Sequence, residues 1–211
     1  TGRGRRRRTW CSPPRLGIYA SLILRPGLEA SRAPLFTFLA AVATADALGE
    51  IARLQARIKW PNDVVVGRRK IAGVLGELRG ADPTIRDMVI GVGVNINQTE
   101  SDFPAEVRDR ATSVRIEAGS GVARAPILSA LLEGFERRYA RLLKEGPQTL
   151  LEEWTALSAI PTGGRVAIHG PSGLRQGTVQ GVDEEGALLL MTDDGERARI
   201  TFADVVEPLW V

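Results

Sequence analysis

Residues 57–78 read RIKWPNDVVVGRRKIAGVLGEL, and this stretch decides how the chain is expected to fold. The residues from Arg57 to Trp60 predict a short strand, which ends at Pro61 because proline lacks the N–H that a sheet ladder needs. Two apolar runs, 64–66 and 71–78, flank a Gly-Arg-Arg turn, and this pattern is typical of a hairpin. The stretch therefore predicts three strands, two of them joined in a hairpin.

Further elements are expected on both sides of this stretch. Upstream, the short apolar run 16–24 predicts a buried strand. Ser31 and Pro34 mark the start of a helix that continues to about Leu54. The elements expected downstream are a strand at 88–97, a polar loop at 99–110, and helices at 126–145 and 148–157. Together these patterns predict an α+β domain, a mixed sheet with flanking helices, over residues 1–159.

The pattern changes at Pro161. Residues 161–211 alternate short strand-like runs with turns rich in glycine and aspartate. This spacing predicts a small all-β barrel of about five strands. We therefore expect two domains, residues 1–159 and residues 160–211.

Composition excludes several classes of protein. Of 211 residues, 44% are hydrophobic and 25% are charged, which is typical of a globular chain. No run approaches the roughly 18 apolar residues of a membrane span. The single cysteine, Cys11, excludes an intramolecular disulfide framework and indicates a reducing, cytoplasmic location. The single histidine, His169, argues against a His/Cys zinc site and against Ser-His-Asp catalysis.

Charge is distributed unevenly along the chain. Residues 1–80 carry 15 lysines and arginines against 5 acidic residues, whereas residues 81–211 carry 13 against 20. Five arginines lie between Arg3 and Arg8. Such a run indicates an anionic partner, either nucleic acid bound by a basic arm or phosphate held by an enzyme loop. A solvated tail is the third interpretation of this run.

Four segments combine residue types that suit ligand chemistry; they are Gly2–Trp10, Lys59–Asp63, Lys70–Glu77 and Gly91–Asn97. In the first, glycines let the backbone wrap a ligand while arginines bind carboxylate or phosphate. In the third, a lysine precedes strand glycines that permit close approach of a ligand. Singly, each segment has a plain structural interpretation: a surface cation at Lys59, a turn cap at Asn62 and Asp63, and bulges at the glycines.

The order and spacing of these segments closely resemble the biotin–protein ligase family, also called biotin–[acetyl-CoA-carboxylase] ligase or holoenzyme synthetase. That family shows a Gly-Arg-Gly-Arg-Arg-Gly loop ending in Trp, then Lys-Trp-Pro-Asn-Asp, then Lys-(Leu/Ile)-Ala-Gly, then Gly-x-Gly-x-Asn. The matching segments here are Gly2–Trp10, Lys59–Asp63, Lys70–Val74 and Gly91–Asn95. The resemblance implies a class II synthetase-like catalytic domain followed by an SH3-like barrel.

Two features depart from the family pattern. Arg7 stands where the family loop usually has glycine. The family's upstream Ser/Thr-Asn segment and a glutamine before the loop have no counterpart in this chain, because Thr1 already lies in the loop. We therefore expect the chain to be an N-terminally incomplete member, without a DNA-binding domain in the part that is present.

The resemblance implies a two-step reaction: ATP and biotin form biotinoyl-5′-AMP, and a lysine of a biotin carboxyl carrier protein then takes the biotinoyl group. Mg²⁺ would offset the charge of the triphosphate, although no metal-binding residues are assigned. The implied catalytic residues are Lys70, Arg5 and Asp63. The implied biotin-binding residues are Arg3, Gly4, Arg5, Lys70 and Gly73. The implied nucleotide-binding residues are Arg3, Arg5, Arg6, Trp10, Lys59, Asn62 and Asn95.

Partners and alternatives follow from the same comparison. We expect a carrier protein or carrier domain of a carboxylase as partner, a possible homodimer, and no membrane. Two other functions stay open at this point, namely a lipoate-type ligase of related fold and an arginine-rich module that binds nucleic acid.

Overall fold

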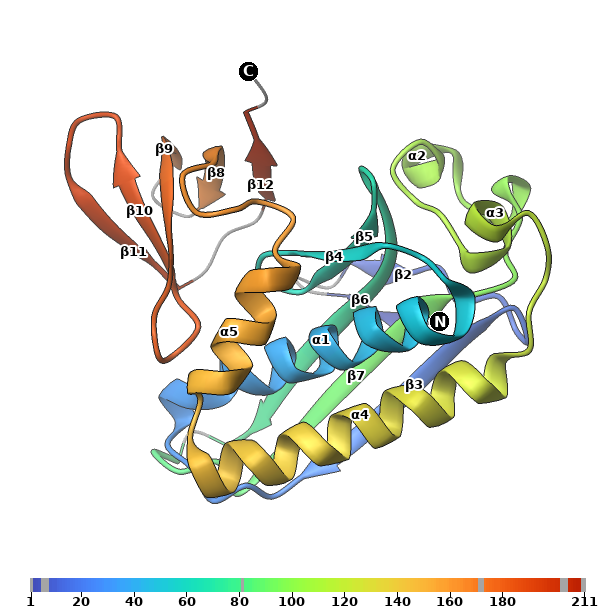
Figure 1. Ribbon diagram of the computed structural model, residues 1–211, viewed down its shortest axis with the longest axis horizontal. Coiled ribbons are helices and arrows are strands. Elements are labelled where there is room, and N and C mark those ends of the chain that lie inside the picture. Colours follow the sequence, from blue (N-terminus) through green and yellow to red (C-terminus); the bar gives the residue numbers. More distant parts are fainter. Residues whose placement is uncertain (1, 5–7, 81, 171–172, 202–204, 210–211) are drawn as a thin grey trace.

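The described residues form two five-stranded antiparallel sheets and a two-stranded hairpin near the N-terminus (Figure 1). Helices pack on one face of the larger sheet, whose strands lie between residues 17 and 95. The structure is a computed structural model that describes residues 2–4, 8–80, 82–170, 173–201 and 205–209. The expected α+β class is confirmed. The division into domains at residues 159 and 160, which falls between the last long helix and the second sheet, stays a prediction.

The larger sheet has five strands in the order β3-β7-β6-β5-β4. Their bounds are β3 Gly17–Leu24, β4 Ala56–Lys59, β5 Asp63–Val66, β6 Arg69–Arg79 and β7 Asp87–Asn95. All four neighbouring pairs are antiparallel, so the expectation of a mixed sheet was wrong for these strands. Short connections join β4 through β7, whereas a parallel pair needs a long crossover. For the residues that the structure describes, parallel pairing occurs only as isolated bridges, among them Ile58 with Ser158.

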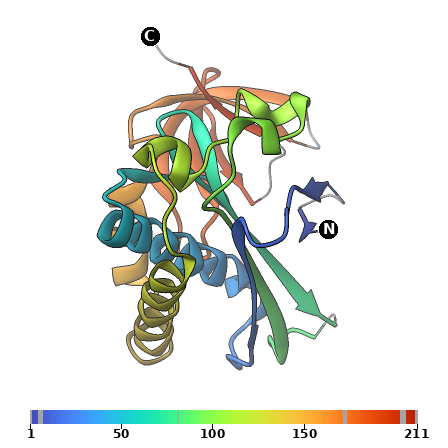
Figure 2. The ribbon, with the colours of Figure 1, turned by 90° about the vertical axis from the view of Figure 1, so that its right-hand side faces the viewer.

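Three longer helices cover one face of this sheet: α1 Ala33–Ala52, α4 Arg124–Glu145 and α5 Gln148–Leu157. Figure 2 shows α1 and α4 on one side of the strands and the N-terminal hairpin on the other. The sequence predicted all three helices, with Pro34 in the first turn of α1. The helices thus leave the opposite face of the sheet open for a site.

Helix α1 is the centre of the core. Residues 30–52 are long and apolar enough to cross a membrane, although the sequence reading found no such run. In the fold, 67% of that window is buried, because α1 lies between the sheet and helices α4 and α5. An apolar surface all round is what a helix packed on several sides requires.

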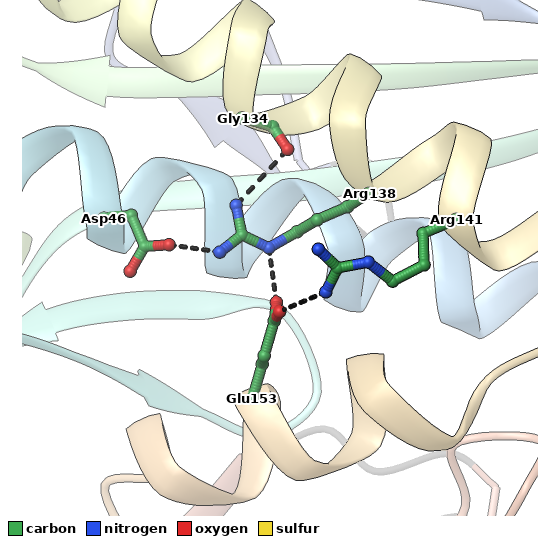
Figure 3. A network of polar contacts seen from close by, with 5 residues as sticks. All are labelled: Asp46, Gly134, Arg138, Arg141 and Glu153. Carbon is green, nitrogen blue, oxygen red and sulfur yellow. Dashed lines mark hydrogen bonds and ion pairs between the residues drawn. The ribbon is translucent and has the colours of Figure 1, made fainter.

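A buried arginine joins the three helices (Figure 3). Arg138 of α4 is 9% exposed and bonds Asp46 of α1 and, at 2.5 Å, Glu153 of α5. Glu153 also pairs with Arg141 at 3.0 Å, and the Arg138 guanidinium donates to the Gly134 carbonyl at 3.2 Å. This network satisfies a charge that would be costly to bury alone.

The second sheet has five strands in the order β11-β10-β9-β8-β12. Their bounds are β8 Arg165–Gly170, β9 Gly173–Val182, β10 Leu188–Thr192, β11 Arg197–Ile200 and β12 Val205–Pro208. The expected number of strands is confirmed, but among the described residues no pairing joins β11 to β12, so no barrel is closed. The sheet remains consistent with an SH3-like domain.

A turn of the second sheet is bonded to the part of the chain that forms the larger sheet. The buried Trp60 indole donates from Nε1 to the Gly186 carbonyl at 3.1 Å. Gly186 has φ +82°, and a Cβ there would lie 3.3 Å from Pro34 and Phe38 at the start of α1. Asp183 caps this turn by accepting from the backbone N–H groups of Glu185 and Ala187. The two sheets therefore share one continuous hydrophobic core.

Short elements account for most of the remaining differences from expectation. The polar segment 99–110, expected as a loop, contains the helical turns η3 Glu100–Asp102 and α2 Ala105–Arg108. Thr99 and Asp102 form a capping box that stabilises the first of these turns. Other elements that were not anticipated are β1 Gly2–Arg3, β2 Thr9–Trp10, η2 Ala30–Arg32, α3 Val114–Ala118 and β12.

Candidate functional site

The candidate site lies on the open face of the larger sheet. Strand register places five residues in one row across it: Lys59, Asp63, Gly73, Gly93 and Tyr19. Residues directly opposite each other in antiparallel strands point to the same face. The row therefore combines a cation, a carboxylate, two bare backbone positions and a phenol on one surface.

The two glycines form a bare floor, which we call the glycine floor. Gly73 and Gly93 are direct partners on β6 and β7. The Trp10 indole lies against both, because a Cβ at Gly73 would be 3.1 Å from Trp10 Cζ3 and one at Gly93 would be 2.7 Å from Trp10 Nε1. Only glycine therefore permits this close approach of a flat ring to the sheet.

Lys70 and Asp63 form an ion pair at the edge of the glycine floor. The Lys70 ammonium lies 2.5 Å from Asp63 Oδ1, with both side chains about one-third exposed at 34% and 31%. The same ammonium lies 5.3 Å from the centre of the Trp10 ring, a cation–π distance. These three residues are separated in the sequence, and the fold brings them into contact.

The backbone at Lys70 is held on both sides. Its N–H donates to the Arg110 carbonyl at 2.8 Å, and its carbonyl accepts from Thr112 N–H at 2.9 Å. Residues 110–112 thus pair with the start of β6 and connect the segment 99–110 to the site.

Strands β1 and β2 pair in a hairpin. Arg3, the first residue of the N-terminal arginine run, lies on β1, and Arg8, the last, directly precedes β2. Gly4 N–H donates to the Arg8 carbonyl at 2.7 Å, and Arg3 and Arg8 are exposed. Arg5, Arg6 and Arg7 lie outside the described residues, so the roles expected for Arg5 and Arg6 stay predictions.

Asn62 fastens the loop that precedes Asp63. Its side-chain amide donates to the Val74 carbonyl at 2.7 Å, and its own carbonyl accepts from Val74 N–H at 2.9 Å. The side chain of Lys59, which lies directly opposite Asp63, makes no hydrogen bond or ion pair with the described residues. The structure therefore holds Asn62 by the sheet and leaves the Lys59 ammonium available for an anion.

Asn95 is set back from the glycine floor. It is 4% exposed, and its amide donates to the Thr112 carbonyl at 2.9 Å while accepting from Gln98 at 3.2 Å. Both ends of the amide are thus engaged within the protein. Its expected role in binding the nucleotide stays a prediction.

Three titratable groups, Tyr19, Cys11 and Asp102, have shifted pKa values. Burial and the nearby Cys11 thiol raise the pKa of Tyr19 to about 12, against the opposing effect of Arg124. Burial, together with Asp102, raises the pKa of Cys11. Hydrogen bonds from the Thr99 backbone and side chain lower the pKa of Asp102. At neutral pH the phenol and thiol are therefore uncharged, and the negative charges in this part of the fold belong to carboxylates.

Metal binding by protein groups alone finds no support. Within the described ranges no cluster of three or more His, Cys, Asp or Glu side chains exists. The carboxylate nearest to Lys70 is that of Asp63, with which it forms the ion pair. A cation that keeps most of its water, as Mg²⁺ does, needs only one or two protein carboxylates.

Gly93 and Tyr19 lie in the candidate site but were not predicted from the sequence as site residues. Gly93 belongs to the segment Gly91–Asn97 that was singled out, but its role depends on the register that sets it opposite Gly73. Alternation along β7 is the signal that could have placed Gly93 on the open face, because its neighbours Val92 and Val94 are buried.

Comparison with known proteins agrees with this geometry. Residues 1–95 match the model of the Biotin/lipoate A/B protein ligase family. Residues 164–206 match the Biotin protein ligase C terminal domain. The two matches cover the site and the second sheet respectively.

Individual relatives and structures extend the match along the chain. A biotin--[acetyl-CoA-carboxylase] ligase of Paracoccus denitrificans is 35% identical, covering 93% of this chain and 82% of its own length. The bifunctional ligase/repressor BirA of Bacillus subtilis is 37% identical over 97% of this chain, which spans 62% of that relative's length. The structure of biotin protein ligase from Aquifex aeolicus, in complex with biotin and ATP, superposes with a TM-score of 0.84 at 27% identity. That superposition covers 98% of this chain and 84% of the Aquifex chain.

Proposed function

This chain belongs to the Biotin/lipoate A/B protein ligase family, and we propose that it ligates biotin to a carrier-protein lysine by way of biotinoyl-5′-AMP. The observation that carries the proposal is the Lys70–Asp63 ion pair at the edge of the glycine floor. A flat ring needs a surface without side chains, and a carboxylate being activated needs a cation at the edge of that surface.

The first step joins two anions, the biotin carboxylate and the α-phosphate of ATP. The carboxylate oxygen attacks the α-phosphorus, and pyrophosphate leaves. The Lys70 ammonium would neutralise both reacting groups, because charge develops on phosphate oxygens in the transition state. Lys59, which has no described partner, and the arginines of the N-terminal run would bind the remaining phosphate charge.

Gly73 would contact the ring system of biotin, Trp10 would contact the nucleotide, and Arg3 and Gly4 would contribute from the hairpin. Bound Mg²⁺ would supply further charge neutralisation at the triphosphate, with Asp63 as the carboxylate in reach. Asn62 would act by holding the Lys59–Asp63 loop in place, because its amide is bonded to Val74.

In the second step the carrier lysine attacks the mixed anhydride and AMP leaves. The incoming ammonium must first lose a proton. Asp63 is a carboxylate beside the reacting groups, so we assign it to accept or orient this proton. A biotin carboxyl carrier protein is the proposed partner. A homodimer and a cytoplasmic location, which the single cysteine favours, complete the proposal.

The test is biotin-dependent exchange of labelled pyrophosphate into ATP, followed by transfer of biotin to a carrier domain. We expect exchange with biotin but not with lipoate, and labelling that is lost when the acceptor lysine of the carrier is replaced by arginine. Exchange that depends on lipoate would replace this proposal with a lipoate ligase. Nucleic-acid binding without any exchange would support the arginine-rich module instead.

A further inference from the structure

The glycine floor is already covered by a ring that belongs to the protein. Trp10 Nε1 and Cε2 would both lie 2.7 Å from a Cβ placed on Gly93, and Trp10 Cζ3 would lie 3.1 Å from one on Gly73. Not even a methyl group fits between the indole and the sheet. A ligand ring and the Trp10 indole therefore cannot lie on this floor together.

The Trp10 indole lacks a hydrogen bond in its contact with the glycine floor. Trp10 Nε1 is buried and has no hydrogen-bond partner among the described residues. A buried N–H without a partner loses the hydrogen bond that it makes in water. The indole is thus held by shape and by the neighbouring Lys70 ammonium rather than by a bond to the sheet.

The element that carries Trp10 is also lightly anchored. Within the described part of the chain, strand β2 pairs only with β1, in a hairpin of two residues per strand. Isolated two-stranded hairpins are marginally stable in water. Next to Trp10, among the described residues, Gly2 N–H donates to Ser12 Oγ at 2.9 Å and the Cys11 thiol donates to the Asp102 carbonyl at 3.4 Å.

We propose that Trp10 is an intramolecular occupant of the glycine floor, so that a ring-bearing ligand binds only after the indole has moved away. Taking biotin as that ligand rests on the proposed function. In the ligand-free protein the site is closed on itself, with the floor under Trp10 and the Lys70 ammonium shared between Asp63 and the indole. The apparent affinity is then reduced by the fraction of molecules in which the floor is open.

Association kinetics test this proposal directly. Stopped-flow measurement of biotin binding should give a faster association for Trp10→Ala than for the parent protein, by about fivefold or more. A residue that only contacts the bound ligand would change the dissociation rate and leave association unaltered. An unchanged or slower association rate for Trp10→Ala would overturn the proposal.

A second measurement needs no ligand and keeps the inference separate from the proposed function. In protein labelled with 5-fluorotryptophan, the ¹⁹F resonance of Trp10 is identified by its loss in Trp10→Phe. Gly93→Ala should shift this resonance and expose it to solvent, because the new Cβ displaces the indole.

Gly91→Ala is the matched control, since Gly91 lies on the same strand and a Cβ there would meet only Leu75, at 3.7 Å. We expect Gly91→Ala to leave the Trp10 resonance unchanged. A Trp10 signal already exposed in the parent protein, or equal effects of the two alanines, would refute the inference. Failure of every variant and the parent to bind biotin, with the fluorine result as expected, would instead refute the proposed function.

Discussion

At the scale of single residues, the open face of the larger sheet brings one ammonium and one carboxylate into contact. Lys70 and Asp63 are seven residues apart in the chain, and their side chains meet because a hairpin turns β6 back along β5. Both groups are about one-third exposed, so their pairing adds little to stability. Their value lies in the charge that they place at the glycine floor.

Lys70→Ala should therefore impair adenylate formation far more than folding. Removing the cation from a closed phosphate site should slow biotin-dependent ATP–pyrophosphate exchange by about 100-fold. The free energy of unfolding should change by less than about 1 kcal/mol. Lys144→Ala, at an exposed position near the end of α4, is the control. Unaltered exchange would remove Lys70 from the site, and a large loss of stability would make it structural.

Asp63→Ala should give a different pattern. Its proposed partner is the incoming amine, so transfer from preformed biotinoyl-5′-AMP to the carrier should fall at least as much as adenylation. Single-turnover rates of the two steps measure this directly. A loss confined to adenylation would restrict Asp63 to the first step.

At the scale of elements, a capped turn of the second sheet braces the loop that leads to Asp63. The Gly186 carbonyl accepts from Trp60, and the turn itself presses against the first turns of α1. Gly186 and Gly195 have the same φ of +82°, but nothing lies within 4 Å of a Cβ on Gly195. Comparing alanine substitutions at Gly186 and Gly195 therefore separates the cost of backbone strain from the cost of crowding.

Gly195→Ala should cost about 1 kcal/mol of stability, because alanine disfavours a positive φ. Gly186→Ala should cost about 2 kcal/mol, because its Cβ also crowds Pro34 and Phe38. Denaturant unfolding of both variants measures the difference. Equal losses would show that the contact with α1 is loose.

The arginine that joins the helices makes a second prediction at this scale. Arg138→Ala should destabilise the protein by about 2–3 kcal/mol, because it leaves Asp46 and Glu153 without their shared partner. The cost stays below that of a fully buried pair because both carboxylates are partly exposed. Arg137→Ala, on the exposed side of the same helix, should be nearly neutral in thermal unfolding. Similar shifts for both arginines would mean that the network contributes nothing.

At the scale of the whole molecule, the two sheets share one core. We therefore expect a single cooperative unfolding transition, although the sequence predicts two domains. Circular dichroism, which follows all secondary structure, should coincide with tryptophan fluorescence, to which Trp60 and Trp154 contribute near the junction between the sheets. Two separated transitions would show that the sheets unfold independently.

The sequence by itself determined the longer elements and the family. Hydrophobic periodicity is a local property, so the strand at 16–24, helices α1, α4 and α5, and the change of pattern at Pro161 were all readable in the chain. The four motifs were readable for the same reason, since each is a short run of residues in a set order.

Only the tertiary structure decided how these parts meet. That the larger sheet is antiparallel, that Gly73 faces Gly93, and that the second sheet stays open all depend on pairing between distant strands. Such pairing is set by register and by packing against α1, neither of which is written in any local pattern. For this reason the motifs named Lys70, Asp63 and Trp10, whereas the contact of Trp10 with the glycine floor appears only in the folded chain.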